Sequence, residues 1–219
     1  MRPSPNFAAH AAVVAVAVAA VAASRALCGA AARAVVAGCI ALLAVPALAD
    51  EAAAWAALRA GGVVALMRHG DAPGVGDPPG WRLDDCATQR NLSERGRDEA
   101  RAAGARLRAE RIAIARVASS PWCRCLETAR LVDVGPVQTE PTFANAFVLH
   151  ERRDALREGG RAVIGRWRGP GVLFVVTHGE NIRALTGRSP ATAEIVVVSM
   201  GAEGAIRDIG SLPAPARLR

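Results

Sequence analysis

Two histidines and two arginines stand at the ends of apolar or helical segments, where a folded chain can bring them together. Arg68 and His69 directly follow one apolar run, and His178 follows a second. Arg124 lies at the start of a segment with helical character. Histidine is a nucleophile that can carry a phosphoryl group, and arginine offers paired N–H donors to phosphate oxygens. These residue types at these positions indicate a covalent phosphoryl-transfer site.

The two apolar runs, 63–67 and 172–177, are continuous rather than alternating. Such runs are typical of strands that are buried on both faces of a parallel sheet. Gly70 allows a sharp turn where the first strand ends. Because ligands of open α/β sheets bind outside the carboxyl ends of the strands, this edge is where a site is expected.

Strand and helix patterns alternate along the rest of the chain, which predicts an α/β sandwich. Ser93 is a plausible N-cap for the second helix, and the Gly/Pro-rich segment 71–80 is expected to form an irregular loop at the mouth of the site. Helices are expected at 50–60, 94–110, 123–131, 152–167 and 179–185, and strands at 63–67, 114–119, 135–139, 172–177, 194–200 and 205–209. The pair Gly159-Gly160 weakens the expectation of a continuous helix over 152–167.

Residues 1–49 differ from the rest of the chain. They contain three arginines, no acidic residue and long apolar runs, and they end in Ala47-Leu48-Ala49 before Asp50. This is the layout of a cleaved secretory signal, so we expect cleavage after Ala49 and a periplasmic or secreted domain over 50–219. A further apolar run at 8–23 leaves two alternatives open, a later translation start and an N-terminal membrane anchor.

The charge of the chain gives little indication of a polyanionic partner. Three of the 27 basic residues fall in 1–49, which leaves 24 against 20 acidic residues, a net charge of +4. All the basic residues are arginine, and they do not cluster with aromatic residues. We therefore expect no nucleic-acid partner, and a membrane partner only if the leader is retained.

Three cysteines remain after the predicted cleavage, Cys86, Cys123 and Cys125. An exported protein can form disulfides, so Cys86 is expected to bridge either Cys123 or Cys125, the alternative being three thiols. There is no Cys-x-x-Cys, and the histidines lack the spacing of metal ligands, so no metal is expected.

Over residues 63–200 the chain resembles the histidine phosphatase superfamily, or phosphoglycerate mutase-like proteins. Arg68-His69-Gly70 and Thr177-His178-Gly179 match its two histidine motifs, and 119–129 matches Ser-Ser-Pro-x-x-Arg-x-x-x-Thr-Ala. Residues 91–96 are similar to the family's Leu-Thr-x-x-Gly helix start. The resemblance, to the small single-domain branch, implies a mostly parallel mixed sheet with helices on both faces and no cofactor.

The resemblance also implies a role for each site residue. His69 would attack phosphorus and form phosphohistidine, while Arg68, Arg124 and His178 would bind the phosphoryl oxygens. Guanidinium charge near His69 is expected to lower the pKa of this histidine and keep it neutral.

The proton donor is harder to place. The mutase-type glutamate position is occupied by Ala146, and the phytase-type aspartate position by Gly179. Glu180, one residue further on, is the first candidate for the general acid. Asp71 is the second, and the third reading is that no acid exists.

These features predict a metal-independent phosphomonoester hydrolase that acts on a small phosphorylated substrate or a phosphorylated glycan. A second hypothesis is a non-catalytic phosphate- or phosphoglycan-binding module on the same fold. A third is a cytoplasmic or membrane-anchored phosphatase, which applies if residues 1–49 are not removed.

Overall fold

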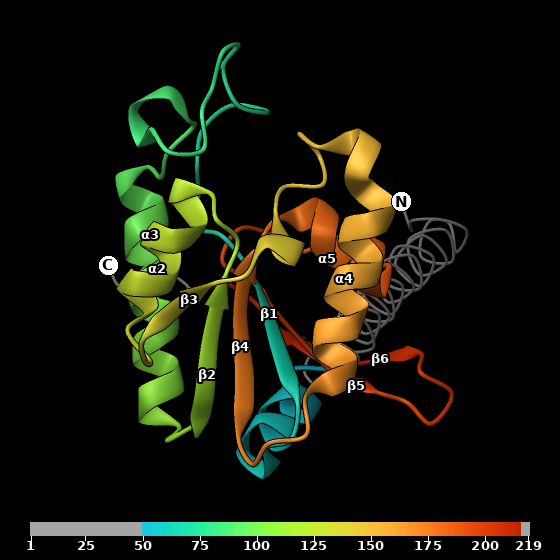
Figure 1. Cartoon of the computed structure of the whole chain (residues 1–219). Helices are drawn as coiled ribbons and strands as arrows, with labels where there is room; N and C mark the ends of the chain where they lie inside the picture. Colours follow the sequence, from blue (N-terminus) through green and yellow to red (C-terminus); the bar gives the residue numbers. More distant parts are fainter. Residues whose placement is uncertain (1–49, 216–219) are drawn as a thin grey trace, which may run out of the picture. The chain divides into compact units, whose positions relative to one another are not determined.

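The structure, a computed structural model, describes residues 50–215. The predicted leader at 1–49 and its cleavage after Ala49 lie outside the described residues. A six-stranded sheet in the order β3-β2-β4-β1-β5-β6 lies between two layers of helices (Figure 1). The strands are β1 (Val64–Arg68), β2 (Ile114–Ser119), β3 (Val137–Thr139), β4 (Val172–Thr177), β5 (Ile195–Met200) and β6 (Ile206–Leu212). The predicted α/β class is confirmed.

The sheet is mixed and mostly parallel. β1 and β4 pair in parallel at its centre, and β2 and β3 extend the parallel part beyond β4. β5 runs antiparallel to β1 and forms the predicted hairpin with β6. Because parallel neighbours need crossover connections, the intervening helices lie on the faces of the sheet.

Two cores form on opposite faces of the sheet, as alternation of side chains along a strand requires. In β1, Ala65 and Met67 pack into the core that includes α2 and α3, whereas Val64 and Leu66 pack toward α4 and α5. The helical elements are residues 50–60, α2 (Glu94–Ala109), α3 (Cys123–Val132), α4 (Arg153–Arg166) and α5 (Gly179–Thr186), with short 3-10 turns η1 (Cys86–Thr88), η2 (Pro141–Phe143) and η3 (His150–Arg152).

α4 is continuous across Gly159 and Gly160, where the sequence favoured a weaker helix. A Cβ on Gly159 would lie 2.7 Å from the Thr142 side chain, and one on Gly160 would lie 3.4 Å from Leu185. Both glycines therefore allow α4 to approach η2 and α5 closely, and this packing offsets the low helix propensity of glycine.

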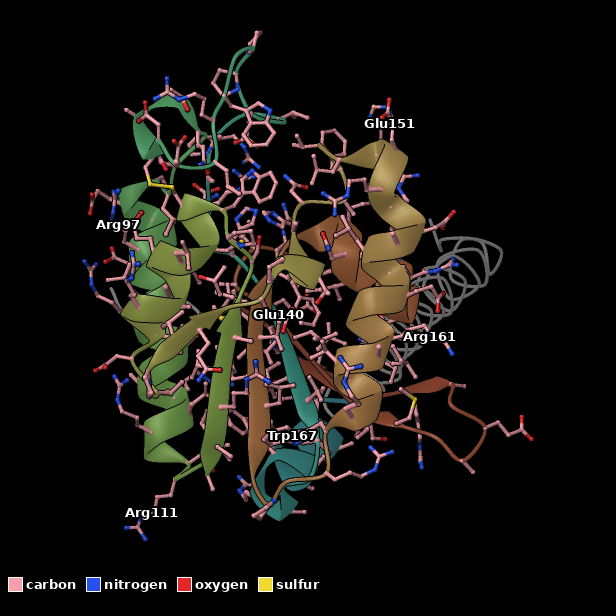
Figure 2. All side chains as sticks on the ribbon, in the orientation of Figure 1. Arg97, Arg111, Glu140, Glu151, Arg161 and Trp167 are labelled. Atoms are coloured by element: carbon pink, nitrogen blue, oxygen red, sulfur yellow. A yellow bond between two sulfur atoms is a disulfide. The ribbon has the colours of Figure 1, made fainter. Side chains whose placement is uncertain are left out.

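The outer faces of the helices carry the charged side chains. Figure 2 shows Arg111, after α2, and Glu151, in η3, pointing outward, whereas Arg97 pairs with Glu127 of α3 and Arg161 donates to the Gly204 carbonyl. Among residues 50–215, no helix is long and apolar enough to cross a bilayer.

Candidate active site

The register of β1 against β4 brings the two predicted histidines together. Arg68 pairs with Thr177, so the next residues, His69 and His178, leave neighbouring strands at the same edge of the sheet. The His69 amide donates to the Thr177 carbonyl at 3.0 Å, and the imidazole centroids are 5.4 Å apart. This is the carboxyl edge of the parallel strands, where ligands of α/β proteins bind.

His69 is held as a neutral imidazole. Its Nδ1 lies 2.8 Å from the Gly70 carbonyl, which can only accept, so Nδ1 carries the hydrogen and Nε2 keeps its lone pair. Burial, followed by the positive charge of Arg124, lowers the pKa of His69 to about 3. The sequence predicts a lowered pKa from arginine charge alone, whereas in the structure burial is the larger cause. A neutral imidazole with Nε2 unprotonated is suited to nucleophilic attack.

The turn after His69 is fixed by residues of two other motifs. The Gly70 amide donates to Thr128 Oγ1 at 3.2 Å, and this hydroxyl donates to the Arg124 carbonyl at 2.7 Å. A Cβ on Gly70 would overlap the Gly96 carbonyl, and a Cβ on Gly96 would overlap the backbone of Asp71. Both positions therefore require glycine, because the two backbones are in direct contact. Ser93, the predicted N-cap of α2, accepts from the Gly96 amide at 3.1 Å.

His178 is buried beside His69. Its Nε2 lies 2.9 Å from Ser120 Oγ and 3.5 Å from Cys125 Sγ, and the Trp122 ring packs edge-on against it. Burial, followed by interaction with His69, lowers the pKa of His178 well below its usual value. Residues of the 119–129 motif thus fix the orientation of this ring.

A cavity of about 500 Å³ opens beside the two histidines. Its wall contains Arg68, His69, His178 and Glu180, all of which the sequence predicted. The loop after β1 also borders it, as expected.

Arg90 also lines the cavity, although none of the sequence motifs predicted it as a site residue. Its Nε donates to the Gly76 carbonyl at 2.8 Å, and its Nη1 donates to the Ala72 carbonyl. Arg90 therefore holds the 71–80 loop in place and adds a positive charge to the site. Its position directly before the 91–96 motif was the one available signal.

Arg124, in contrast, does not belong to the cavity wall. It is fully buried, and its Nη1 and Nη2 donate to the two carboxylate oxygens of Asp77 at 2.7 and 3.3 Å. Its charge still acts on both histidines, whose pKa values it lowers. Direct binding of phosphate by Arg124 therefore stays a prediction.

Two buried guanidinium N–H groups near the histidines lack an acceptor. Within residues 50–215, three buried side-chain polar atoms have no hydrogen-bond partner, and two of them are Nε of Arg68 and Nε of Arg124. Arg68 is otherwise anchored through Nη1, which donates to the Pro190 carbonyl at 2.8 Å. Because a buried donor without an acceptor is unfavourable, Nε of Arg68, a residue of the cavity wall, suits an anionic oxygen supplied by a ligand.

Two candidate acids, Asp71 and Glu180, border the cavity. A hydrogen bond from Ser93 at 2.6 Å is the main cause that lowers the pKa of Asp71, and Arg95 adds to it, so Asp71 is a poor proton donor. Both carboxylate oxygens of Glu180 accept from Arg183, at 2.7 and 3.0 Å, and Arg153 lies 3.4 Å away. Proton donation by Glu180 would require release of one of these contacts.

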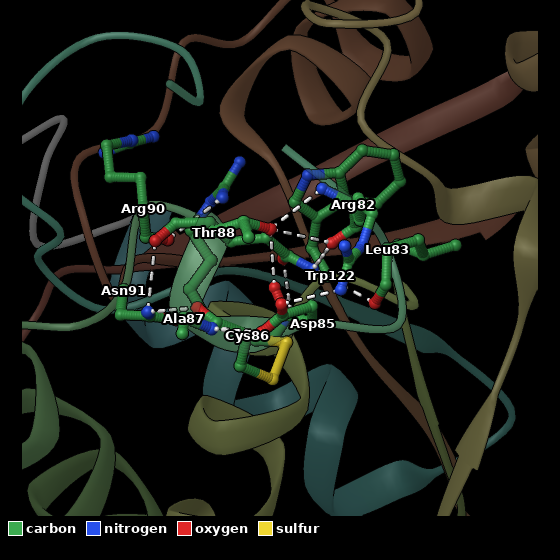
Figure 3. Close-up of a disulfide and its surroundings, with 12 residues drawn as sticks. Arg82, Leu83, Asp85, Cys86, Ala87, Thr88, Arg90, Asn91 and Trp122 are labelled. Carbon is green, nitrogen blue, oxygen red and sulfur yellow. Dashed lines mark hydrogen bonds and ion pairs between the residues drawn. A yellow bond between two sulfur atoms is a disulfide. The ribbon is translucent and has the colours of Figure 1, made fainter. Parts of the chain in front are cut away.

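A disulfide joins Cys86 to Cys123, and Cys125 remains a buried thiol whose pKa burial raises to about 12. Nearby, Gln89 Oε1 accepts from the Cys123 amide at 3.1 Å. The Cys86–Cys123 disulfide fastens the segment before Arg90 to the first residue of α3, next to Arg124. Figure 3 shows the Arg90 side chain pointing away from this disulfide.

Comparison with known proteins agrees with this architecture. A family model described as the histidine phosphatase superfamily (branch 1) matches residues 64–190, so the chain belongs to this superfamily. The family predicted from the motifs is confirmed. Among curated proteins, no sequence matches the chain.

Solved structures that share the fold include three phosphatases. The protein histidine phosphatase SixA complexed with tungstate is 21% identical, with a TM-score of 0.50, over 69% of this chain and 97% of its own. The mycobacterial glucosyl-3-phosphoglycerate phosphatase is 17% identical, with a TM-score of 0.50, over 69% and 99%. A phosphoserine phosphatase mutant from Entamoeba histolytica, in complex with phosphoserine, is 12% identical, with a TM-score of 0.50, over 68% and 95%.

Proposed function

We propose that this protein is a metal-independent phosphomonoester hydrolase that works through a phosphohistidine at His69. The observation that carries the proposal is a buried, neutral His69 with Nε2 unprotonated, beside a cavity that Arg68 and Arg90 also line. Membership of the histidine phosphatase superfamily supports phosphatase activity in general.

In the first step, Nε2 of His69 attacks phosphorus as the bond to the ester oxygen breaks, and the electron pair leaves on that oxygen. Nδ1–H continues to donate to Gly70 and stabilises the positive ring. In the second step, water attacks phosphorus and the electron pair of the N–P bond returns to Nε2. One proton of that water stays on the phosphate, and the other reaches the departed alkoxide or phenolate.

The remaining residues act on the charge that develops. Arg68 and Arg90 donate to the phosphoryl oxygens, and His178 contacts them from the adjacent strand. Arg124 supports the site by its positive charge, and its unpaired Nε is the donor through which it would reach an oxygen. Glu180 is paired with Arg183 and would have to leave that contact before it could protonate a poor leaving group.

The test is hydrolysis of p-nitrophenyl phosphate by the purified protein with EDTA present. We expect turnover that is abolished in His69→Ala and retained in His150→Ala, a change to a histidine on the exposed turn η3. Equal activity of His69→Ala and the unchanged protein would refute the proposed nucleophile.

A second candidate function is a phosphate-binding module without turnover. It is favoured by one observation, the engagement of both cavity carboxylates by other side chains. Binding of vanadate or phosphate by a folded protein that shows no hydrolysis of p-nitrophenyl phosphate would support it over the hydrolase.

We also propose that the domain functions after export, on a small phosphorylated substrate or phosphorylated glycan. The Cys86–Cys123 disulfide supports this location, because such bonds persist in oxidising compartments. N-terminal sequencing of protein from cell fractions tests it: a mature start at Asp50 is expected, and an intact leader would contradict it.

A further inference from the structure

The cavity extends well beyond the space that a phosphoryl group fills, and part of its rim is apolar. Three large hydrophobic side chains are exposed within residues 50–215: Val75 (88%), Phe147 (52%) and Leu83 (44%). Val75 and Phe147 both line the cavity, next to Pro73 and Pro190. Exposed apolar side chains that gather at a ligand cavity, rather than singly on the surface, mark a place where a ligand loses contact with water.

Phe147 is held in place at this rim. Its amide donates to Asn145 Oδ1 at 3.0 Å, and the adjacent Ala146 amide donates to Asn181 Oδ1 at 3.2 Å. Asn181 lies in the first turn of α5, three residues after His178. The start of α5 therefore positions both His178 and the segment that carries Phe147. A Cβ on Gly76 would lie 3.7 Å from the Phe147 ring, which places the 71–80 loop beside it.

The hydrogen bonding of the cavity carboxylates indicates which leaving group the site can accept. Its two carboxylates, Asp71 and Glu180, are occupied by hydrogen bonds and ion pairs, so the departing oxygen meets no carboxyl that is free to protonate it. A phenol has a pKa near 10, far below the value of about 16 for water. A phenolate therefore leaves with little help from an acid, whereas an alkoxide does not.

We propose that the substrate is an aryl phosphate, whose ring packs against Phe147 and Val75 while its phosphoryl group faces His69. This inference rests on the proposed hydrolase and deepens it by assigning the leaving group. The His69–phosphorus bond forms as the phosphorus–oxygen bond to the ring breaks, and the electron pair stays on the phenolate. Hydrolysis of the phosphohistidine then supplies the proton that converts the phenolate to the phenol.

Calorimetric titration with two non-hydrolysable phosphonates tests the ring subsite without requiring turnover. We expect phenylphosphonate to bind about tenfold more tightly than methylphosphonate. In Phe147→Ala this preference should shrink to less than about threefold, with the affinity for methylphosphonate unchanged. The matched control is Leu83→Ala, an exposed apolar side chain outside the cavity wall, which should keep the full preference.

Equal binding of the two phosphonates by the unchanged protein, or a preference that survives in Phe147→Ala, would overturn the inference and leave the hydrolase standing. Binding of neither phosphonate would remove the anion site and both proposals with it.

A phosphonate analogue of phosphotyrosine, free and within an octapeptide, separates the two sources of an aryl phosphate. Tighter binding of the peptide identifies a protein side chain, and equal binding identifies a small molecule; either result supports the aryl class. Failure of the free analogue to compete with phenylphosphonate would contradict it.

Discussion

Asp77 and Arg124, which lie 47 positions apart in the chain, form an ion pair at 2.7 Å in which both side chains are fully buried. The Asp77 carboxylate also accepts from the Arg90 amide at 3.0 Å and from Trp122 Nε1 at 2.9 Å. One carboxylate thus connects the loop after β1, the arginine of the cavity wall and the start of α3. Asp77 neutralises a buried charge and at the same time positions Arg90.

Replacement of Asp77 by asparagine should therefore destabilise the protein strongly. Removal of one partner of a buried ion pair leaves the other charge uncompensated, at a cost of about 3–5 kcal/mol. We expect a loss of this size in the free energy of unfolding, measured with denaturant. Asp84→Asn is the control, since Asp84 pairs with Arg82 at 3.6 Å on an exposed surface. A change below about 1 kcal/mol in Asp77→Asn would show that water screens the pair.

The ion pair between Asp77 and Arg124 should also make the stability of the protein depend on pH. Burial acts to raise the pKa of Asp77, but the hydrogen bonds and charge of Arg124 together with the Arg90 amide lower it overall. Because the folded pKa lies below the unfolded value of about 3.9, the stabilisation is complete above that pH and is lost as the pH falls through the folded pKa. The stability difference between the unchanged protein and Asp77→Asn should be constant from pH 7 to about pH 4 and shrink at lower pH. A difference that shrinks between pH 7 and 5 would contradict this assignment.

His69 should remain neutral across the physiological range. Its folded pKa of about 3 lies below the unfolded value of about 6.5, so acid favours unfolding throughout this interval. Nitrogen NMR of the ligand-free protein should show Nδ1 protonated and Nε2 unprotonated from pH 8 to about pH 4. The urea-unfolded protein is the control, and its histidines should titrate near pH 6.5. Protonation of folded His69 near pH 6.5 would mean that it is accessible to water.

The Cys86–Cys123 bond should contribute to stability because it closes a loop with a sequence separation of 37. Chain-entropy arguments give about 4 kcal/mol for such a loop as an upper value. The double replacement Cys86→Ser with Cys123→Ser should lower the free energy of unfolding by about 2–4 kcal/mol and weaken phosphate binding, since the segment that carries Arg90 is released. Reductant should lower the free energy of unfolding of the unchanged protein and leave that of the double variant the same. Equal free energies of unfolding for the unchanged protein and the double variant would show that the disulfide does not stabilise the fold.

The core and both histidines could be predicted from the sequence because their signals are local. Continuous apolar runs identify β1 and β4, and each histidine directly follows its strand. Asp77 and Arg90 act through the path of an irregular loop, which has no periodicity to indicate which side chains turn inward. The ion pair between Asp77 and Arg124 is consequently invisible in the sequence, although it decides that Arg124 does not border the cavity.

The cysteine pairing illustrates the same limit at shorter range. Cys123 and Cys125 are equally plausible partners of Cys86 by spacing. Residues two apart in a helix point to different sides, so only one of them can face η1 while the other faces the core. In the structure Cys123 bonds to Cys86, and Cys125 packs against His178.

The contact between Gly70 and Gly96 predicts opposite outcomes for two glycine replacements in helices. Gly96→Ala increases helix propensity, but its Cβ would overlap the backbone of Asp71 beside the nucleophile. We expect a loss of about 1–3 kcal/mol in stability together with weaker phosphate binding. Gly165→Ala is the matched control, since its Cβ would meet the flexible end of Met200 at 3.0 Å. Stability of Gly165→Ala should change by less than about 1 kcal/mol, and a tolerated Gly96→Ala would contradict the close contact.

Glu180→Gln distinguishes a proton donor from a residue of the wall. If Glu180 releases Arg183 to protonate the leaving group, the variant loses activity in proportion to the basicity of that group. In that case kcat/KM would fall less than about threefold for p-nitrophenyl phosphate and about a hundredfold or more for an alkyl phosphate. Because Glu180 is paired with Arg183, we expect instead a fall of less than about threefold for both substrates. Glu158→Gln, on the exposed face of α4, should leave both values unchanged. A larger and equal fall for both substrates would instead mean that Glu180 orients the substrate through Arg183, because a lost hydrogen bond in the ground state does not depend on the leaving group.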